Sequence, residues 1–409
     1  MKRKKVTSIR VPYAQAVYGK EEIAAVNRVL KNPSKLSPGA SVAQFEKEIS
    51  KKFGKREGIM VNSGSSANLI AFEALNLPKG SEVITPVFTF ATTVAPLIQK
   101  GLVPVFVDVE EGTYVVNVAQ VEKAITKKTK AIMIPLLLGN LPDMAKLQKL
   151  ARKHKLFFVE DSCDTLGATF NGKPSGTYTD ISTTSFYASH IITAAAGGGM
   201  VCFTDAALAR RGRVIASWGR QSTLFGFHEK SEDIQKRFAG KLGGETYDAK
   251  FIFSEIGYNF QSTELNAAFG IEQLRRLPEF AKRRAAAFAE LYAFFQKYER
   301  WFILPRQSNK VKTSWLAFPL TLRLGTPFTR SEITKYLEEH NIQTRPIFTG
   351  NILRQPAYGR VTHRKGVPVF PIADTVMKNG FLIGAHHGLS NAQMKYLKVT
   401  LANFLAQYK

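Results

Sequence analysis

The sequence predicts an α/β protein with a mainly parallel sheet, followed by a small C-terminal α+β domain. Over the first two-thirds of the 409 residues, short apolar runs alternate with amphipathic helical patterns. Strands separated by helices are typical of parallel sheets that carry helices on both faces. The strand patterns are continuously apolar, which indicates burial on both sides of the sheet. Beyond about residue 300 the pattern changes, which indicates a second and smaller unit.

The individual elements follow from these patterns in chain order. Strands are predicted at 58–61, 82–86, 103–109, 131–138, 156–160 and 200–203, with helices at 67–77, 91–100, 118–126 and 144–154. Residues 219–250 are polar and irregular, and a segment of that length suggests a functional loop or lid. A long helical pattern covers 263–297. The C-terminal unit is predicted to hold a strand at 315–322 and helices at 330–340 and 391–408.

These elements divide the chain into four parts. We expect an N-terminal segment (1–35), a large cofactor-binding α/β domain (36–262), a connecting helix (263–300) and a small α+β domain (301–409).

The composition excludes several classes of protein. The chain has 57 Lys and Arg against 32 Asp and Glu, a formal charge of +25. Such a charge is typical of phosphate-binding surfaces, but the basic residues are spread over many helices and the longest cluster is Lys2–Lys5. No helix-turn-helix, zinc-finger or aromatic-basic spacing is present, so we expect a solvated basic surface and no nucleic-acid partner.

The apolar runs and the cysteines indicate the compartment. No apolar run approaches the roughly 18 residues of a membrane span, and no apolar signal-peptide core follows the basic start. We therefore expect no membrane partner. The two cysteines, Cys163 and Cys202, exclude a disulfide scaffold and any site that needs four thiolates from one chain. A reducing, cytoplasmic location is expected.

Three segments carry residues that suit chemistry. The serine-rich turn 62–68 precedes a helix and suits either a phosphate or a simple helix cap. The acidic segment 160–164 ends a buried strand, where it could bind a metal, cap a helix or pair with a protonated heterocycle. His190 in 185–190 is either structural or catalytic. The triple glycine 197–199 has the wrong spacing for a dinucleotide fingerprint.

The order and spacing of these three segments resemble the sugar aminotransferase (DegT/DnrJ/StrS) family of fold-type-I pyridoxal-phosphate (PLP) proteins, nearly end to end. The resemblance implies an aspartate-aminotransferase-like fold, with a mixed, mainly parallel seven-stranded sheet in the large domain. It also implies roles for individual residues. Phosphate ligands match Gly64, Ser65, Ser66 and Ser185; the aromatic stacked on the pyridine ring matches Phe90; the partner of the ring nitrogen matches Asp161; and the residue sent into a neighbouring subunit's site matches Asn259.

One substitution separates this chain from the aminotransferases. That family needs a lysine at the position of His190 to form an imine with the cofactor, and an imidazole cannot form one. The replacement resembles the nucleotide-hexulose 3-dehydratases, which hold PLP or pyridoxamine phosphate (PMP) non-covalently. Asp164, where aminotransferases have glutamine near the ring hydroxyl, is a second mark of this subgroup. Further stretches that resemble it are 101–109, 138–141, 161–167, 217–220, 344–348 and 350–356.

The subgroup divides according to its electron donor. One branch carries an iron–sulfur cluster on four cysteines, and 221–240 contains no cysteine where that branch needs them. The remaining branch uses L-glutamate to regenerate PMP, acts on GDP-4-keto-6-deoxymannose in the colitose pathway and forms homodimers with shared sites. Arg220, Gln343 and Arg345 are then expected to bind substrate, because guanidinium matches diphosphate and carboxylate oxygens. Surface ion pairs are the alternative for the two arginines.

The resemblance implies that His190 removes a proton from the bound cofactor and protonates the departing 3-hydroxyl. Two other functions stay open at this stage: a nucleotide-sugar 4-aminotransferase that uses another lysine, and a non-catalytic sugar-nucleotide-binding homologue. The sequence departs from the subgroup at 191–198, at Gln261 and at Gln343. His363, His386 and His387 are expected to be structural or to lie at the rim.

Overall fold

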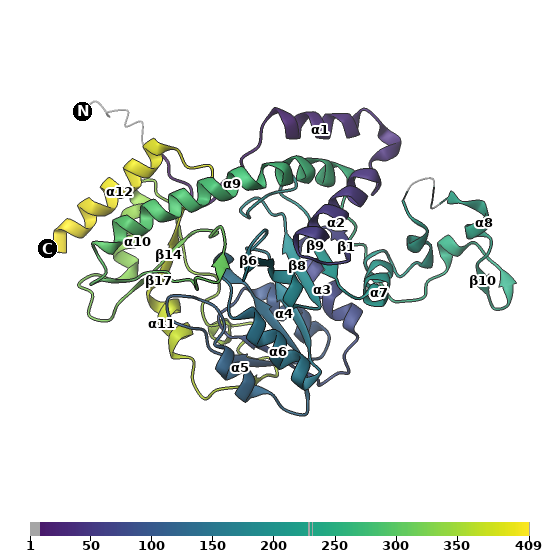
Figure 1. The fold of residues 1–409 in the computed structure, drawn as a ribbon, viewed down its shortest axis with the longest axis horizontal. Coiled ribbons are helices and arrows are strands. Elements are labelled where there is room, and N and C mark those ends of the chain that lie inside the picture. The colour runs from purple at the N-terminus through teal and green to yellow at the C-terminus, as the bar shows by residue number, and fades with distance from the viewer. Residues whose placement is uncertain (1–8, 228–229, 231, 409) are drawn as a thin grey trace.

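The computed structural model describes residues 9–227, 230 and 232–408. Figure 1 shows the arrangement of its elements. The largest sheet has eight strands in the order β1-β9-β8-β5-β4-β2-β3-β16. Strand β9 is antiparallel to both neighbours, and the other neighbouring pairs are parallel, which confirms a mainly parallel mixed sheet. The strands are β1 (Glu57–Val61), β2 (Glu82–Pro86), β3 (Val103–Val107), β4 (Thr129–Pro135), β5 (Phe157–Asp161), β8 (Ile181–Ser185), β9 (Gly199–Phe203) and β16 (Arg364–Lys365).

Two of these strands were not predicted. Strand β8 is buried throughout but consists mostly of Ser and Thr, so it gives no apolar run. Its hydroxyls bond inside the fold: Thr184 Oγ1, for example, donates to the carbonyl of Ser162 at 3.1 Å. Strand β16 comes from the segment expected to form the small domain, and it adds an eighth strand beside β3. Arg364 fixes it there through two bonds to the Glu82 carboxylate, at 2.8 and 2.9 Å.

The predicted strand 131–138 is wrong at its end. Strand β4 stops at Pro135, because the chain turns and Leu138 adopts a left-handed φ of 60°. The predicted helix 67–77 begins earlier, at Gly64, because Ser63 caps it and accepts a hydrogen bond from the Ser66 amide at 3.1 Å.

Helices cover both faces of the large sheet. Successive residues of β2 belong to hydrophobic clusters on opposite faces of the sheet. Val83 packs in the cluster of Ile70 and Phe72, whereas Ile84 packs in the cluster of Leu147. This alternation confirms burial on both sides. The covering helices are α2 (Ala40–Lys52), α3 (Gly64–Leu75), α4 (Ala91–Gln99), α5 (Val118–Ala124), α6 (Met144–His154) and α7 (Ala206–Ala216).

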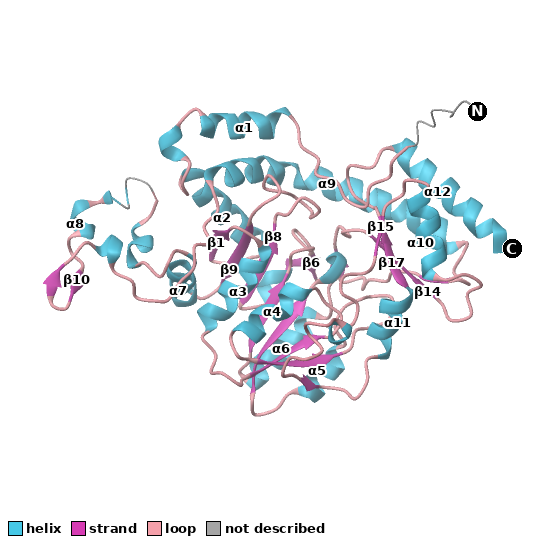
Figure 2. Ribbon diagram, turned by 180° about the vertical axis from the view of Figure 1, so that it is seen from behind, coloured by secondary structure: helices cyan, strands magenta, loops and turns pink. Residues whose placement is uncertain are grey.

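A single long helix, α9 (Glu264–Gln296), joins the large sheet to the C-terminal unit, close to the predicted bounds (Figure 2). Helix α1 (Lys20–Leu30) lies along its first half. Glu22 is fully buried between them and accepts hydrogen bonds from Gln273 Nε2 at 2.6 Å and Arg276 Nη1 at 3.2 Å.

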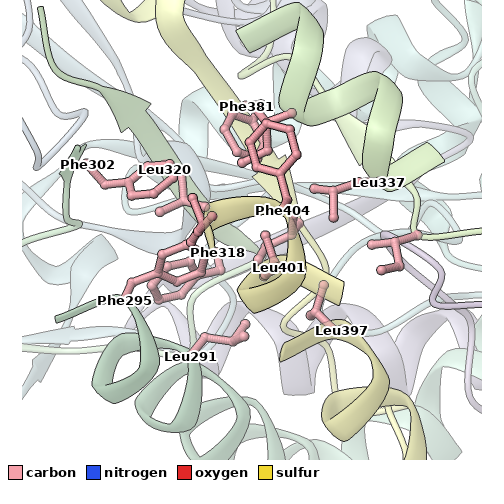
Figure 3. Close-up of a cluster of buried hydrophobic side chains, with 14 of the residues drawn as sticks. Leu291, Phe295, Phe302, Phe318, Leu320, Leu337, Phe381, Leu397, Leu401 and Phe404 are labelled. Carbon is pink, nitrogen blue, oxygen red and sulfur yellow. The ribbon is translucent and has the colours of Figure 1, made fainter. Parts of the chain in front are cut away.

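The C-terminal unit has a four-stranded antiparallel sheet in the order β12-β14-β17-β15. It shares a dense aromatic core with the end of α9, in which Phe295 and Phe318 stack with ring centroids 5.5 Å apart (Figure 3). Its elements are β12 (Phe302–Ile303), β14 (Phe318–Leu322), α10 (Arg330–Glu339), β15 (Thr344–Arg345), α11 (Pro371–Asn379), β17 (Gly380–Ile383) and α12 (Asn391–Leu405).

The predicted loop after residue 219 forms an arm that projects from the body (Figure 1). Arg237 pairs with Asp248 and also with Glu232, at 3.2 Å from Nη1 to Oε2. The arm contains α8 (Ile234–Arg237), β10 (Lys241–Leu242) and β11 (Glu245–Thr246); elsewhere, β6 (Thr169–Phe170), β7 (Lys173–Pro174) and β13 (Val311–Lys312) form a small separate sheet.

Two expectations concern the surface of the molecule. The basic cluster Lys2–Lys5 lies outside the described residues. Across the part of the chain that the structure describes, none of the helices combines the length and apolarity that a bilayer crossing requires.

Candidate active site

A cavity of about 570 Å³ lies where β2, β5 and β8 end, next to the four-stranded sheet of the C-terminal unit. Ligands of open α/β sheets bind at the carboxyl ends of the parallel strands, and this cavity has that position. Residues of β15 and β17 complete its wall. Most of the predicted site residues line it: Gly64, Ser65, Phe90, Asp161, Asp164, Ser185, His190 and Arg345.

The start of helix α3 forms one corner of the cavity. A Cβ atom on Gly64 would lie only 2.6 Å from Ser185 Cβ and 2.8 Å from Cys163 Sγ, so this close approach requires glycine. Free amides and the helix dipole make such a corner suitable for a phosphate. Ser66 does not line the cavity, because its hydroxyl donates to Asn62 Oδ1 at 2.6 Å within the cap.

Asp161, the last residue of β5, is held rigidly in the cavity wall. Its Oδ2 accepts hydrogen bonds from Asn68 Nδ2 at 2.9 Å and from Thr93 Oγ1 at 2.8 Å, and its Oδ1 accepts one from the Cys163 amide at 3.2 Å. A fixed, nearly buried carboxylate suits a protonated ring nitrogen. Within the described residues, no group of three or more His, Cys, Asp or Glu side chains is arranged to hold a metal ion.

His190 and Asp164 lie next to each other in the wall of the same cavity. Its Nδ1 lies 3.4 Å from Asp164 Oδ1, and this buried nitrogen has no hydrogen-bond partner. The other Asp164 oxygen, Oδ2, accepts the Leu138 amide at 3.1 Å. A structural histidine normally has its nitrogens satisfied, so an unpartnered nitrogen in a cavity wall favours proton transfer. Among the described residues that line the cavity, none is a lysine.

Phe90 occupies the N-cap position of α4 and lines the cavity. Half of its surface is exposed. Its ring meets Phe348 edge to face, with centroids 6.5 Å apart. An exposed aromatic held in this way can pack against a planar ring in the cavity.

Three predicted residues lie elsewhere. Arg220 lines a second cavity of about 590 Å³ beside the arm, and its guanidinium lies 4.7 Å from the Trp218 ring centroid. Gln343 accepts the Tyr13 amide through Oε1 at 3.2 Å. Asn259 forms an isolated antiparallel β-bridge with Ser217, and it does not line the main cavity of its own chain.

Sequence reasoning missed Tyr13, Tyr187 and Thr93, which also line the main cavity. No motif marks Tyr13, because a bridge between Val11 and Ile342 carries its segment there from the N-terminus. Burial, and then the nearby Asp164 charge, raise the pKa of Tyr13 well above its usual value. Tyr187 lies inside the predicted segment 185–190, between Ser185 and His190, and that position was the available signal.

The remaining titratable groups near the site have structural roles. Burial, followed by the charge of Asp161, raises the pKa of the Cys163 thiol well above its usual value, so this thiol stays protonated. Burial and Arg284 lower the pKa of His386 to about 4 and that of His387 to about 2. His386 Nε2 lies 3.0 Å from the Pro12 carbonyl oxygen. Both histidines are buried, which agrees with a structural role rather than a position at the rim.

The cavity fits the expected vitamin B6 cofactor. The glycine at position 64 leaves space at a helix start, the Asp161 carboxylate is fixed, and His190 lines the same cavity. Gly64, Ser65 and Ser185 would hold the phosphate, Asp161 the ring nitrogen and Phe90 the ring face.

The fold and this site define a protein of the fold-type-I pyridoxal-phosphate class. The model of the DegT/DnrJ/EryC1/StrS aminotransferase family matches residues 17–401, and the chain belongs to that family. The family and fold predictions are therefore confirmed.

Relatives with curated names include sugar dehydratases. The lipopolysaccharide biosynthesis protein RfbH of Salmonella typhimurium is 37% identical over 96% of this chain and 90% of its own. The dTDP-4-dehydro-2,6-dideoxy-D-glucose 3-dehydratase of Saccharopolyspora spinosa is 36% identical over 91% and 82%. The GDP-4-keto-6-deoxy-D-mannose 3-dehydratase of Yersinia pseudotuberculosis is 33% identical over 95% and 97%.

Solved structures agree with these relatives. The Escherichia coli GDP-4-keto-6-deoxy-D-mannose-3-dehydratase with bound hydrated PLP superposes with a TM-score of 0.86 and 28% identity, over 96% of this chain and 100% of that chain. A structure of the same activity, with a trapped PLP–glutamate geminal diamine, gives 0.83 at 28% identity over the same shares.

Proposed function

We propose that this protein is a PLP/PMP-dependent 3-dehydratase of a nucleotide-linked 4-keto-6-deoxyhexose. The observation that carries the proposal is His190, which lines a cavity that no described lysine lines and whose buried Nδ1 lies 3.4 Å from Asp164 Oδ1. Imidazole can take and give a proton near neutral pH, but it cannot form the imine of an aminotransferase. The GDP-linked relatives make GDP-4-keto-6-deoxymannose the substrate to test first, and a dTDP-linked sugar the second.

The residues divide the work as follows. The bound cofactor supplies an amine for the 4-keto group and a ring that accepts an electron pair. Asp161 keeps the ring nitrogen protonated, and Phe90 fixes the plane of the ring. His190 takes the proton released next to that ring and returns it to the leaving 3-hydroxyl. Asp164, 3.4 Å away, stabilises His190 while it is protonated.

Glutamate balances the reaction. The sugar C3–O bond is broken and replaced by a C–H bond, which requires two electrons. L-Glutamate supplies these two electrons, and its carbon skeleton leaves as 2-oxoglutarate while its nitrogen is released as ammonia. The C3 oxygen leaves as water, and a water oxygen becomes the keto oxygen of 2-oxoglutarate, so no net water is formed. Arg345 lines the cavity, which supports a role for its guanidinium in binding a carboxylate or a diphosphate there.

The experiment mixes the purified protein with PLP and glutamate, and then adds a 4-keto-6-deoxy sugar nucleotide. Loss of the aldehyde absorption, followed by equimolar ammonia and a 3-deoxy product, is the expected result. A stable 4-amino sugar would instead identify an aminotransferase. No spectral change would identify a non-catalytic binding homologue.

His190→Lys tests the central residue. This variant should lose dehydration and gain an imine that borohydride traps, and His154→Lys on the surface of α6 is the control. Dehydration that persists in His190→Lys would contradict the role of His190.

We also propose a homodimer in which Asn259 completes the opposite site. The placement of Asn259 outside its own chain's cavity supports this proposal. Mixing inactive His190→Lys with weakened Asn259→Ala should restore one functional site per mixed dimer, whereas sites built from one chain would show no recovery.

The four-part division of the chain at residues 35, 262 and 300 is likewise our proposal, as is a cytoplasmic role in dideoxysugar biosynthesis for lipopolysaccharide O-antigen. The relative named for lipopolysaccharide biosynthesis supports that role.

A further inference from the structure

A buried arginine lies directly behind the His190 segment. Arg284 projects from the middle of α9, and only 1% of its surface is exposed. Its Nη2 donates to the His190 carbonyl oxygen at 3.3 Å, and its Nη1 donates to the Leu316 carbonyl oxygen at 2.9 Å. Its Nε donates to His387 Nδ1 at 3.1 Å. The guanidinium thus joins three separate segments.

All of these acceptors are neutral. His387 is neutral because burial and the guanidinium itself hold its pKa at about 2. Burial lowers the pKa of Arg284 to about 10, and the charges of Tyr13 and Asp164 offset part of this effect. An uncharged side chain here would leave the three acceptors buried without their donor, so Arg284 also contributes to stability. A test of its role at the site must therefore separate folding from turnover.

The segment that Arg284 holds needs support. After His190, Ala195 and Ala196 both have left-handed φ values, of 53° and 64°. The imidazole has no hydrogen bond to fix it at Nδ1. The ring lies beside Asp164, with 3.4 Å between Nδ1 and Oδ1. The described bonds of the His190 backbone are that of its own amide to the Tyr187 carbonyl oxygen, at 3.0 Å, and the bond from Arg284, and they help to set the position of the ring.

We infer that Arg284 is a positioning residue, which sets the His190 imidazole relative to the cavity and to the C-terminal unit through Leu316. This inference rests on the proposed function, because it takes His190 as the acid/base. Misplacing a catalytic group by about 1 Å can cost about 100-fold in rate.

The test compares Arg284→Met, which is similar in length but uncharged, with Arg284→Lys and with the control Arg283→Met. Arg283 is the adjacent residue of α9, is 45% exposed and lies 3.7 Å from Glu279. We expect Arg284→Met to lower the melting temperature, because buried acceptors lose their donor, and kcat per folded molecule for dehydration to fall about 10- to 100-fold at a temperature well below unfolding. KM should change little, Arg284→Lys should recover part of kcat, and Arg283→Met should match the wild type.

A second readout does not depend on turnover. Diethyl pyrocarbonate modification of His190, followed by peptide mass spectrometry on the cofactor-free protein, should be several-fold faster in Arg284→Met because the segment is released. An unchanged kcat and an unchanged modification rate would overturn the inference. A loss of kcat that parallels a loss of folded protein would overturn it too, since it would indicate a structural role. If the wild type itself catalyses no dehydration, the proposed function fails, and the modification rate still decides the role of Arg284.

Discussion

Replacing Gly64 with alanine tests where the cofactor phosphate lies. The new Cβ would lie 2.6 Å from Ser185 Cβ and 2.8 Å from Cys163 Sγ, whereas carbon contacts are normally about 3.5–4.0 Å. The overlap of about 1 Å must be relieved by moving the start of α3 away from Ser185. Such overpacking typically costs about 1–3 kcal/mol. If that strain falls on the phosphate corner, PLP affinity drops about 5- to 150-fold.

Fluorescence titration of the cofactor-free protein with PLP measures this loss. Pyridoxal, which lacks the phosphate, serves as the internal comparison, and its affinity should change much less. Gly19→Ala is the control variant, because its Cβ would make only ordinary contacts at the start of α1, with 3.4 Å to the nearest atom. Equal losses for PLP and pyridoxal, or no loss for either, would refute the phosphate assignment.

Three further predictions concern single carboxylates. Asp161→Asn should slow the glutamate half-reaction about 100-fold or more, because the ring nitrogen loses its fixed anion; stopped-flow absorbance measures this, and a near-normal rate would remove Asp161 from the mechanism. Glu264→Ala should cost about 2–4 kcal/mol in urea unfolding, because its carboxylate accepts three amides at the start of α2 at 2.6–2.9 Å; an unchanged midpoint would contradict this capping role. Burial opposes ionisation of Glu22, but the Gly19 amide, Gln273 and Arg276 outweigh it and lower its pKa. The stability that ionised Glu22 contributes is therefore complete above a pH of about 4.3 and is lost as the pH falls through the pKa of Glu22 in the folded state. In Glu22→Gln, the free energy of unfolding should fall less steeply with decreasing pH than in the wild type. Parallel plots of unfolding free energy against pH for the two proteins would refute this.

Apolar runs in the sequence predicted the bounds of a strand well where the strand is buried by apolar packing alone. The predicted bounds of β2 match the structure. They failed at β8, because its buried Ser and Thr hydroxyls bond to groups outside the strand, such as Asn68 Oδ1 and the Ser162 carbonyl oxygen, and so give no apolar pattern. They failed at the end of β4, because the left-handed turn at Leu138 carries no glycine at that position to mark it.

The candidate site was predictable where motifs directly follow strands. Phe90, Asp161 and Ser185 come after β2 or at the ends of β5 and β8, and topology brings these strand ends together. Arg284 and Tyr13 could not be found in this way. Their positions depend on how a long helix and an N-terminal segment pack, and the sequence has no local signal for that packing.

Strand β16 has a consequence for how the polypeptide is made. Its partner β3 leaves the ribosome long before Arg364 is synthesised, so β3 remains an unpaired edge strand of the central sheet during much of translation. The free backbone groups of such an edge strand can pair with another chain. We expect nascent chains of this protein to need chaperone protection until the last part is released, and fragments that end before residue 364 to aggregate.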